Sequence, residues 1–232
     1  MVATHTTPAA PETGGRPNFS LCITRFTAMT KRLLCSLATA ALATGMILAS
    51  PAFAAIAQGT SAPAFTAQAS HDGKASTISL EDALKKGPVI VYFFPSAYTG
   101  GCDIEAHAFA TESAKFASAG ATIIGVSADS IDRLNKFSAD PSYCAGKFPV
   151  VSDPDGKIAK QFDVKMSAAE PGAKDVRGEA IEHGFISRVT FVIGKDGKVA
   201  AVFSSEADHL HPQEHVSKSL AVVQQLQSGK AP

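Results

Sequence analysis

A cysteine at position 102 lies where the sequence favours thiol chemistry. It follows a strongly apolar run, Val89 to Phe94, which is typical of a buried strand, and it precedes Asp103 to Phe109, which is typical of the start of a helix. Free N–H groups at a helix N-terminus and the positive end of the helix dipole stabilise a thiolate. A free thiol has a pKa of about 8.5, and we expect this setting, with a nearby arginine, to lower it to about 6. The pattern therefore predicts a reactive cysteine.

Three residues, Pro95, Thr99 and Cys102, have the spacing Pro-x-x-x-Thr-x-x-Cys. This spacing resembles the active-site signature of the peroxiredoxins, which are thiol peroxidases with a thioredoxin-like fold. Arg188 begins a segment, Arg-Val-Thr-Phe-Val-Ile, that resembles the family's Arg-x-Thr-Phe-Val-Ile strand. The segments that look like the bacterioferritin-comigratory, or Q-type, branch are Thr99 to His107, Ile124 to Ser130 and Phe148 to Gly156. The resemblance implies this branch of the alkyl hydroperoxide reductase/thiol-specific antioxidant family.

The resemblance makes Cys102, Thr99, Arg188 and Pro95 the catalytic set, and their chemistry fits that role. The Thr99 hydroxyl can donate to one peroxide oxygen and accept from the other, and the Arg188 guanidinium can hold thiolate and peroxide without losing its charge. Pro95 has no N–H and can shield the thiolate from water. Taken singly, each residue also has an ordinary structural interpretation, such as a small buried cysteine or a solvent-facing arginine. Their joint spacing favours catalysis.

The resemblance also implies a resolving cysteine, because attack on a peroxide leaves a sulfenic acid that a thiol must reduce. Many members of the branch carry it five residues after the peroxidatic cysteine, but this chain has His107 there. The assignment then falls on Cys144, in the loop Asp140 to Gly146. A disulfide requires Cα atoms within about 7 Å, so we expect the first turn after Cys102 and the loop around Cys144 to unfold during turnover. Two alternatives stay open: a structural disulfide, and a one-cysteine enzyme that uses an external thiol.

Residues 29–54 have the pattern of a secretory signal peptide. A short basic segment, 29–32, precedes an apolar run, 33–48, and Ala52-Phe53-Ala54 is a small-x-small cleavage site. The apolar run is shorter and richer in alanine than a typical membrane span, which needs about 20 apolar residues. An uncleaved anchor is the alternative.

Residues 1–28 are expected to be a non-native or disordered extension, with translation beginning at Met29. Cleavage of the leader removes Cys22 and Cys35 and leaves 55–232 as one domain. The whole chain has a formal net charge of zero, and the remaining part has 17 basic and 20 acidic side chains. This balance excludes the strongly basic surface of a nucleic-acid-binding protein. We expect a periplasmic or secreted protein with no stable membrane association after cleavage.

Strands alternate with helices in this domain and end in a hairpin and a helix. The order predicts an α/β thioredoxin-like fold, a central mixed sheet with helices on both faces. Turns are expected at 70–74 and 194–197, with Ser79 as a helix N-cap. The expected strands are 76–78, 89–94, 121–127, 148–151, 188–193 and 199–203, and the expected helices are 80–86, 103–119, 130–137, 157–162 and 214–226. Residues 165–184 show no period and predict a long, mobile loop.

Two further features remain open in the sequence. Glu105 lies one turn beyond Cys102, where it either orients the arginine or is an exposed helix carboxylate. His209, His211 and His215 are close together, but their neighbours indicate a loop that enters a helix, so we expect no metal and no cofactor.

The sequence thus predicts an exported peroxidase that reduces hydrogen peroxide or organic hydroperoxides. Its expected partner is a thioredoxin-like reductant, and we expect a monomer or weak dimer. The alternatives are a periplasmic thiol–disulfide oxidoreductase and a disulfide-based redox sensor. The first usually carries Cys-x-x-Cys, whereas the residues three before and three after Cys102 are Thr99 and Glu105.

Overall fold

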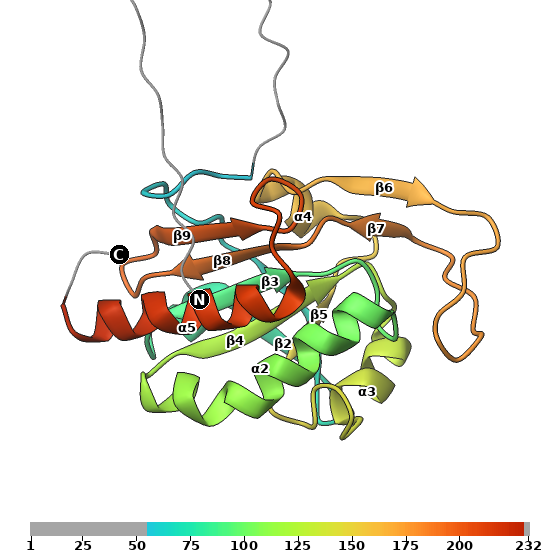
Figure 1. The fold of residues 1–232 in the computed structure, drawn as a ribbon, viewed down its shortest axis with the longest axis horizontal. Helices are drawn as coiled ribbons and strands as arrows, with labels where there is room; N and C mark the ends of the chain where they lie inside the picture. The colour runs from blue at the N-terminus through green and yellow to red at the C-terminus, as the bar shows by residue number, and fades with distance from the viewer. Residues whose placement is uncertain (1–54, 230–232) are drawn as a thin grey trace, which may run out of the picture. The chain divides into compact units, whose positions relative to one another are not determined.

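The computed structural model describes residues 55–229, which form a seven-stranded mixed sheet in the order β2-β1-β5-β4-β3-β8-β9 and a separate pair, β6-β7 (Figure 1). The strands are β1 (Thr66–His71), β2 (Lys74–Ser79), β3 (Val89–Phe93), β4 (Thr122–Ser127), β5 (Val150–Ser152), β6 (Met166–Ala169), β7 (Gly184–Ile186), β8 (Val189–Ile193) and β9 (Val199–Ser204). The helices are α1 (Leu80–Leu84), α2 (Gly100–Ser118), α3 (Ile131–Ala139), α4 (Lys157–Gln161) and α5 (Pro212–Gln227). The predicted α/β class with a mixed central sheet is confirmed.

Strand β3 lies at the centre of the sheet, and all its residues are buried. It pairs in parallel with β4 and antiparallel with β8. Its side chains alternate between two core clusters, with Val91 and Phe93 in one and Ile90 and Tyr92 in the other. Residues of α1 and α4 complete the first cluster, and residues of α2, α3 and α5 complete the second, so helices cover both faces as predicted (Figure 1).

Most predicted elements are present with their ends shifted by one to three residues. Helix α2 begins at Gly100 instead of 103, so Cys102 lies inside its first turn. Strand β5 begins at Val150, directly after Pro149, because proline has no N–H to donate to a neighbouring strand. The Ser79 hydroxyl accepts a hydrogen bond from the Asp82 N–H over 3.3 Å, which confirms the predicted N-cap.

The prediction that 165–184 is a loop without regular structure is wrong at both ends. Met166 pairs antiparallel with Ile186, and Ala169 pairs with Gly184. Strand β6 is mostly exposed, so it lacks the apolar alternation by which a strand is recognised in sequence. A Cβ at Gly184 would lie 1.9 Å from the Ser167 carbonyl oxygen, which means that only glycine permits this close pairing.

The predicted extension, 1–28, and the predicted signal peptide, 29–54, lie outside the described residues. Within residues 55–229, no helix combines the length and apolar character needed to cross a membrane.

Candidate active site

Cys102 is the third residue of α2, just beyond the carboxyl end of β3. The turn between the two elements requires an unusual backbone, because Tyr98 has a φ of +60°, in the left-handed region. Thr99 then adopts an extended conformation as the N-cap, and the Cys102 N–H donates to its carbonyl oxygen over 2.8 Å. The Cys102 residue is only 2% exposed. The thiol therefore lies at a helix N-terminus, as the sequence predicts, but inside the protein.

Arg188 reaches the thiol from the neighbouring strand. Because β3 and β8 are antiparallel, Phe93 at the end of β3 pairs with Val189 at the start of β8, which brings Arg188 to the same edge of the sheet. Its Nη2 donates to Cys102 Sγ over 3.3 Å, and its Nη1 donates to the carboxylate of Glu105. The Arg188 side chain is 10% exposed, so the ion pair is largely removed from water.

Thr99 and Pro95 flank this centre, and both are half-buried. In the described conformation the Thr99 hydroxyl donates to the Ser96 carbonyl oxygen over 2.8 Å, which leaves the hydroxyl oxygen free to accept. To donate to a peroxide, as its predicted role requires, the hydroxyl must therefore rotate away from Ser96.

Burial raises the pKa of the Cys102 thiol above its ordinary value. The Arg188 guanidinium, the backbone of Ser96 and the Thr99 hydroxyl oppose this effect and act to lower the pKa. The predicted net lowering of the pKa is therefore not found in the closed site, because the sequence pattern gives no measure of how completely the sulfur is desolvated. The thiolate depends on Arg188 for its stabilisation.

Glu105 is fully buried, so the interpretation of this residue as an exposed helix carboxylate is wrong. One oxygen accepts from Arg188, whereas Oε1 has no hydrogen-bond partner among the described residues. Burial raises the pKa of Glu105 to about 7, although Arg188 opposes the rise. Glu105 lies three residues beyond Cys102, and this helical spacing is the sequence signal that puts both side chains on one face.

The predicted resolving residue, Cys144, lies in the turn that follows α3. It is completely buried, and Cys102 and Cys144 are both free thiols. Burial raises the pKa of Cys144 well above its ordinary value, and the nearby carboxylates of Asp103 and Asp140 add to the effect. Cys144 is therefore protonated at neutral pH.

An aromatic contact joins the two cysteine-bearing segments. The ring of Tyr98, in the turn before Cys102, lies edge-on to the ring of Tyr143, with their centroids 5.3 Å apart. Both rings also pack against Phe137 of α3. The segments that carry Cys102 and Cys144 are thus in contact through Tyr98 and Tyr143.

A second buried ionic cluster, which sequence reasoning missed, holds the turn before α2 from the other side. Asp129 accepts from the Ser96 hydroxyl over 2.9 Å and from the Ala97 N–H over 2.7 Å. Arg133 contacts Asp129 over 2.8 Å and also donates to the Ala97 carbonyl and to Asp175. The middle of the segment between β6 and β7 is thereby tied to the turn that precedes the reactive cysteine.

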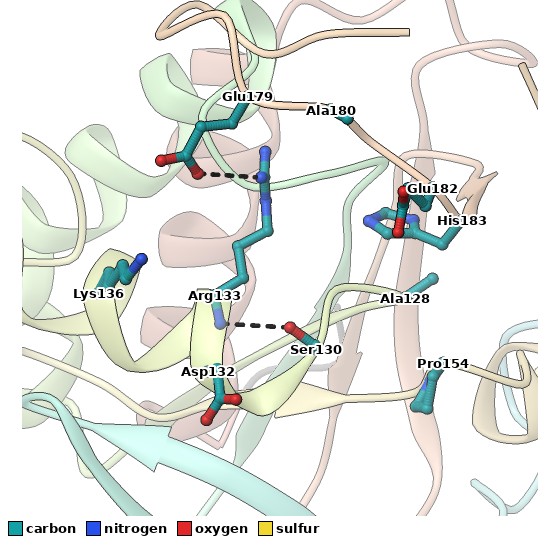
Figure 2. A pocket seen from close by; sticks show the side chains of 10 residues that line it. All are labelled: Ala128, Ser130, Asp132, Arg133, Lys136, Pro154, Glu179, Ala180, Glu182 and His183. Carbon is teal, nitrogen blue, oxygen red and sulfur yellow. Dashed lines mark hydrogen bonds and ion pairs between the residues drawn. The ribbon is translucent and has the colours of Figure 1, made fainter. Parts of the chain in front are cut away.

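Part of this cluster lines a cavity of about 410 Å³ (Figure 2). Figure 2 shows Arg133 extending from the first turn of α3, where its N–H meets Ser130, towards Glu179 on the segment opposite. His183 lies on the far side of the cavity, and its Nε2 is 2.9 Å from Asp129. Among the charged side chains around the cavity, Arg133 is paired with Glu179, and the lining residues include no thiol comparable to Cys102.

The three histidines that are close in sequence do not face one another as ligands. His215 is fully buried with both ring nitrogens near hydroxyl groups, whereas His209 and His211 are exposed. Within residues 55–229, no three or more His, Cys, Asp or Glu residues are grouped to hold a metal ion.

Comparison with known proteins agrees with this geometry. A family model described as the AhpC/TSA family matches residues 58–202. A putative peroxiredoxin of Mycobacterium tuberculosis is 34% identical over 146 residues, which are 63% of this chain and 84% of that protein. The chloroplastic peroxiredoxin Q of Oryza sativa subsp. japonica is 30% identical over 173 residues, 74% of this chain and 68% of that protein.

Solved structures show the same likeness. The crystal structure of peroxidoxin BcpB from Mycobacterium tuberculosis matches with a TM-score of 0.58 and 30% identity, over 73% of this chain and 97% of that chain. A structure of Xanthomonas campestris peroxiredoxin Q matches with a TM-score of 0.52 and 26% identity, over 69% of this chain and 90% of that chain. The chain therefore belongs to the AhpC/TSA family, in its bacterioferritin-comigratory or Q-type peroxiredoxin branch, and is an oxidoreductase of the peroxidase class.

Proposed function

We propose that the chain is a two-cysteine peroxidase in which Cys102 attacks hydrogen peroxide or an organic hydroperoxide. A bond forms between Cys102 Sγ and one peroxide oxygen while the O–O bond breaks, so the sulfur is oxidised to a sulfenic acid. The leaving oxygen takes a proton and departs as water or an alcohol. The observation that carries this proposal is the buried thiol with a guanidinium nitrogen 3.3 Å from its sulfur.

Arg188 and Thr99 have the positions from which they can stabilise charge in this step. The guanidinium already contacts the sulfur and has further N–H groups that can donate to the peroxide. The Thr99 hydroxyl, once it rotates from Ser96, supplies a donor to the leaving oxygen. Donors aimed at charge that develops on the peroxide lower the barrier more than thiolate formation alone. Pro95 limits the access of water.

Cys144 is the proposed resolving residue. Its sulfur attacks the sulfenic sulfur of Cys102, an S–S bond forms, and the S–O bond breaks with release of water after proton transfer from the Cys144 thiol. A thiol reductant of the thioredoxin type then reduces the disulfide by exchange. We propose that the protein does this as a monomer or weak dimer.

We propose that both segments leave the described conformation when the disulfide forms, because both cysteines are buried free thiols. The proposal is that the first turn of α2 unwinds, and that the turn 140–146 opens, with loss of the contact between Tyr98 and Tyr143. Amide hydrogen exchange in both segments should then be faster in the oxidised protein than in the reduced one. Equal exchange in the two states would contradict the proposed movement.

The central experiment mixes the reduced protein with one equivalent of hydrogen peroxide and follows it by intact mass and non-reducing peptide mapping. Replacement of Cys22 and Cys35 by serine removes the cysteines of the predicted leader from the analysis. Rapid peroxide loss with a Cys102–Cys144 disulfide is the expected result. Oxygen added to Cys102 with Cys144 free would instead identify a one-cysteine enzyme, and no reaction at Cys102 within minutes would refute the peroxidase.

We propose that residues 29–54 direct export to the periplasm or beyond, with cleavage after about Ala54. The support is the pattern of basic, apolar and small residues in the sequence. Cell fractionation and N-terminal sequencing of the protein produced in a bacterial host test this. An exported chain that begins near Ala55 is expected, and a cytoplasmic chain that retains 29–54 would contradict it.

A further inference from the structure

A line of buried polar groups continues from Arg188 and Glu105 into the interface between β8 and α5. Thr190 of β8 and His215 of α5 are both fully buried. The Thr190 hydroxyl lies 2.9 Å from His215 Nδ1, and His215 Nε2 lies 2.9 Å from the Ser205 hydroxyl. These contacts extend the Cys102 site well beyond the residues of the active-site signature.

The His215 ring faces the oxygen of Glu105 that lacks a partner. Its Nδ1 is 3.9 Å from Glu105 Oε1, too far for a direct hydrogen bond. The Thr190 hydroxyl, which lies 2.9 Å from the same Nδ1 and acts to lower the pKa of Glu105, is the group that can bridge the two. The described hydrogen bond of the Thr190 hydroxyl is with His215, yet this hydroxyl is close enough to Glu105 to lower its pKa. A buried carboxylate oxygen without a donor is costly, which favours an arrangement that supplies one.

The imidazole of His215 is neutral at physiological pH. Burial and the nearby Arg188 lower its pKa to about 4, although Asp208 and Glu214 oppose the change. A neutral imidazole has one donor nitrogen and one acceptor nitrogen. Four charged or titratable groups surround the His215 ring. They are Glu105 on α2, Arg188 before β8, Asp208 after β9 and Glu214 on α5 itself.

Two arrangements of the protons satisfy His215, and they differ in what Glu105 receives. If Nε2 carries the proton and donates to Ser205, Thr190 must donate to Nδ1, and Glu105 Oε1 stays without a donor. If Nδ1 carries the proton, it donates to the Thr190 oxygen, Ser205 donates to Nε2, and the Thr190 proton is free for Glu105 Oε1. Only the second arrangement gives the ionised Glu105 carboxylate a hydrogen-bond donor at Oε1.

We propose, on the basis of the peroxidatic role proposed for Cys102, that Thr190 and His215 are positioning residues of this active site. His215 donates through Nδ1 to Thr190, and Thr190 donates to Glu105 Oε1. The carboxylate, held at both oxygens, fixes the Arg188 guanidinium against the sulfur of Cys102. Neither Thr190 nor His215 touches the reacting atoms, so each acts through Glu105 and Arg188.

The test follows the protonation of Glu105 directly, by the infrared band of its protonated carboxyl group, identified as the band lost in Glu105→Gln. In the native protein, half of the Glu105 carboxyl groups are expected to be protonated at a pH of about 7, which is the midpoint of the titration. Thr190→Val removes the donor and should move the midpoint upward by about half to one pH unit, the size expected for one hydrogen bond to a carboxylate. His215→Leu should move it in the same direction.

Two conservative variants and one control separate positioning from packing. Thr190→Ser keeps the hydroxyl, and His215→Asn keeps an N–H donor near the position of Nδ1, so both should lie closer to the native midpoint than Thr190→Val and His215→Leu. Ser219 is also a buried residue of α5, and its hydroxyl has no hydrogen-bond partner among the described residues, so Ser219→Ala should leave the midpoint unchanged. An unchanged midpoint in Thr190→Val, or an equal shift in Thr190→Ser, would overturn the proposal.

The rate at which hydrogen peroxide oxidises Cys102 provides the second readout. Thr190→Val should slow this rate about threefold to tenfold at pH 7, because a displaced guanidinium stabilises the transition state less well. The infrared midpoint does not depend on peroxide chemistry. If the native protein and its variants show the expected midpoints of Glu105 but Cys102 is not oxidised, the proposed function is refuted and the positioning roles of Thr190 and His215 stand. If Cys102 is oxidised but the midpoints do not shift as expected, only the positioning roles are refuted.

Discussion

Glu105 and Asp129 are both completely buried carboxylates near the reactive cysteine, yet the protein surrounds them differently. Glu105 receives a hydrogen bond from Arg188 at one oxygen, and its other oxygen has no partner among the described residues. Asp129 has donors at both oxygens. They are the Ser96 and Ser127 hydroxyls, the Ala97 N–H and His183 Nε2, and Arg133 adds an ion pair at 2.8 Å.

The difference in donors gives the two carboxyl groups opposite pKa shifts. Burial tends to raise the pKa of Asp129, but His183, the Ala97 N–H and other donors lower it below its ordinary value. Burial raises the pKa of Glu105 to about 7, and Arg188 and Thr190 together do not reverse this. Desolvation is common to both sites, so the number of donors decides which group stays charged.

The comparison separates a cluster whose carboxylate has donors at both oxygens from one whose carboxylate has a donor at only one oxygen among the described residues, as the reactivity proposed for Cys102 requires. The Asp129 cluster holds the turn at Ala97 with donors at both carboxylate oxygens, and it contains no thiol. The Cys102 cluster leaves a thiol and a carboxylate to share one guanidinium, Arg188. The guanidinium contacts both groups and still has N–H groups that can donate to a peroxide.

The largest expected effect is on stability at Asp129. Asp129→Asn should lower the free energy of unfolding by about 3–5 kcal/mol, because the Ser96 and Ala97 donors lose a charged acceptor and Arg133 loses one of its two buried counter-charges. Asp155→Asn is the matched control, since the pair of Asp155 with Lys157 is exposed and its loss should leave the free energy of unfolding nearly unchanged. Urea unfolding measures both. A loss below about 1 kcal/mol for Asp129→Asn would remove the distinction between the clusters.

At the other cluster, the largest effect should be on rate. Arg188→Met should slow oxidation of Cys102 by about 10²–10³-fold, the range found when a transition-state donor is removed. Stability should fall less than in Asp129→Asn, because Glu105, with its pKa already at about 7, can take up a proton when the arginine is lost. Peroxide consumption in a quenched-flow assay gives the rate.

Arg188→Lys is the informative companion to Arg188→Met. Lysine keeps the charge but lacks the planar fork that contacts sulfur and carboxylate together, so its rate should lie between those of the native protein and Arg188→Met. A lysine variant as fast as the native protein would show that charge alone suffices.

The stability of the native protein should depend on the ionisation of Glu105. Its folded pKa of about 7 is raised above the ordinary value of 4.5, so its favourable contribution is complete below pH 4.5 and is lost as the pH rises through 7. Glu105→Gln should remove this dependence. The difference in unfolding free energy between native and Glu105→Gln proteins should therefore change by about 1–3 kcal/mol from pH 5 to pH 8, with the native protein losing the more. A constant difference would show that Glu105 is charged throughout.

The smallest predicted effect tests how closely Arg188 is held. A Cβ at Gly101 would lie 3.1 Å from Arg188 Nη2, so Gly101→Ala should displace the guanidinium slightly and slow oxidation of Cys102 about threefold to tenfold. Gly100 is the control, because a Cβ there has no atom within 4 Å, and Gly100→Ala should leave the rate unchanged. Equal rates in the two variants would indicate that the guanidinium adjusts freely.

Local patterns predicted the elements that position the reactive thiol. The continuous apolar run of β3, the Ser79 cap and the turns at 70–74 and 194–197 each depend on a few neighbouring residues, and all are present. Strand β6 was not predicted, because its pairing with β7 joins segments separated by a long connection and leaves β6 mostly exposed. Pairing between distant segments leaves no periodic signature in either one.

The sequence by itself determined the family and the place of Cys102 at a helix N-terminus, and it predicted Pro95, Thr99 and Arg188 as the companions of this cysteine from their types and spacing. Only the tertiary structure decided that Glu105 is buried and that Thr190, His215 and Asp129 surround the site. Burial and donor number arise from residues that are far apart in the chain and meet only when the sheet and its helices pack. Burial and the number of hydrogen-bond donors set the charge of each carboxyl and thiol group, so the charges of the site depend on the tertiary structure.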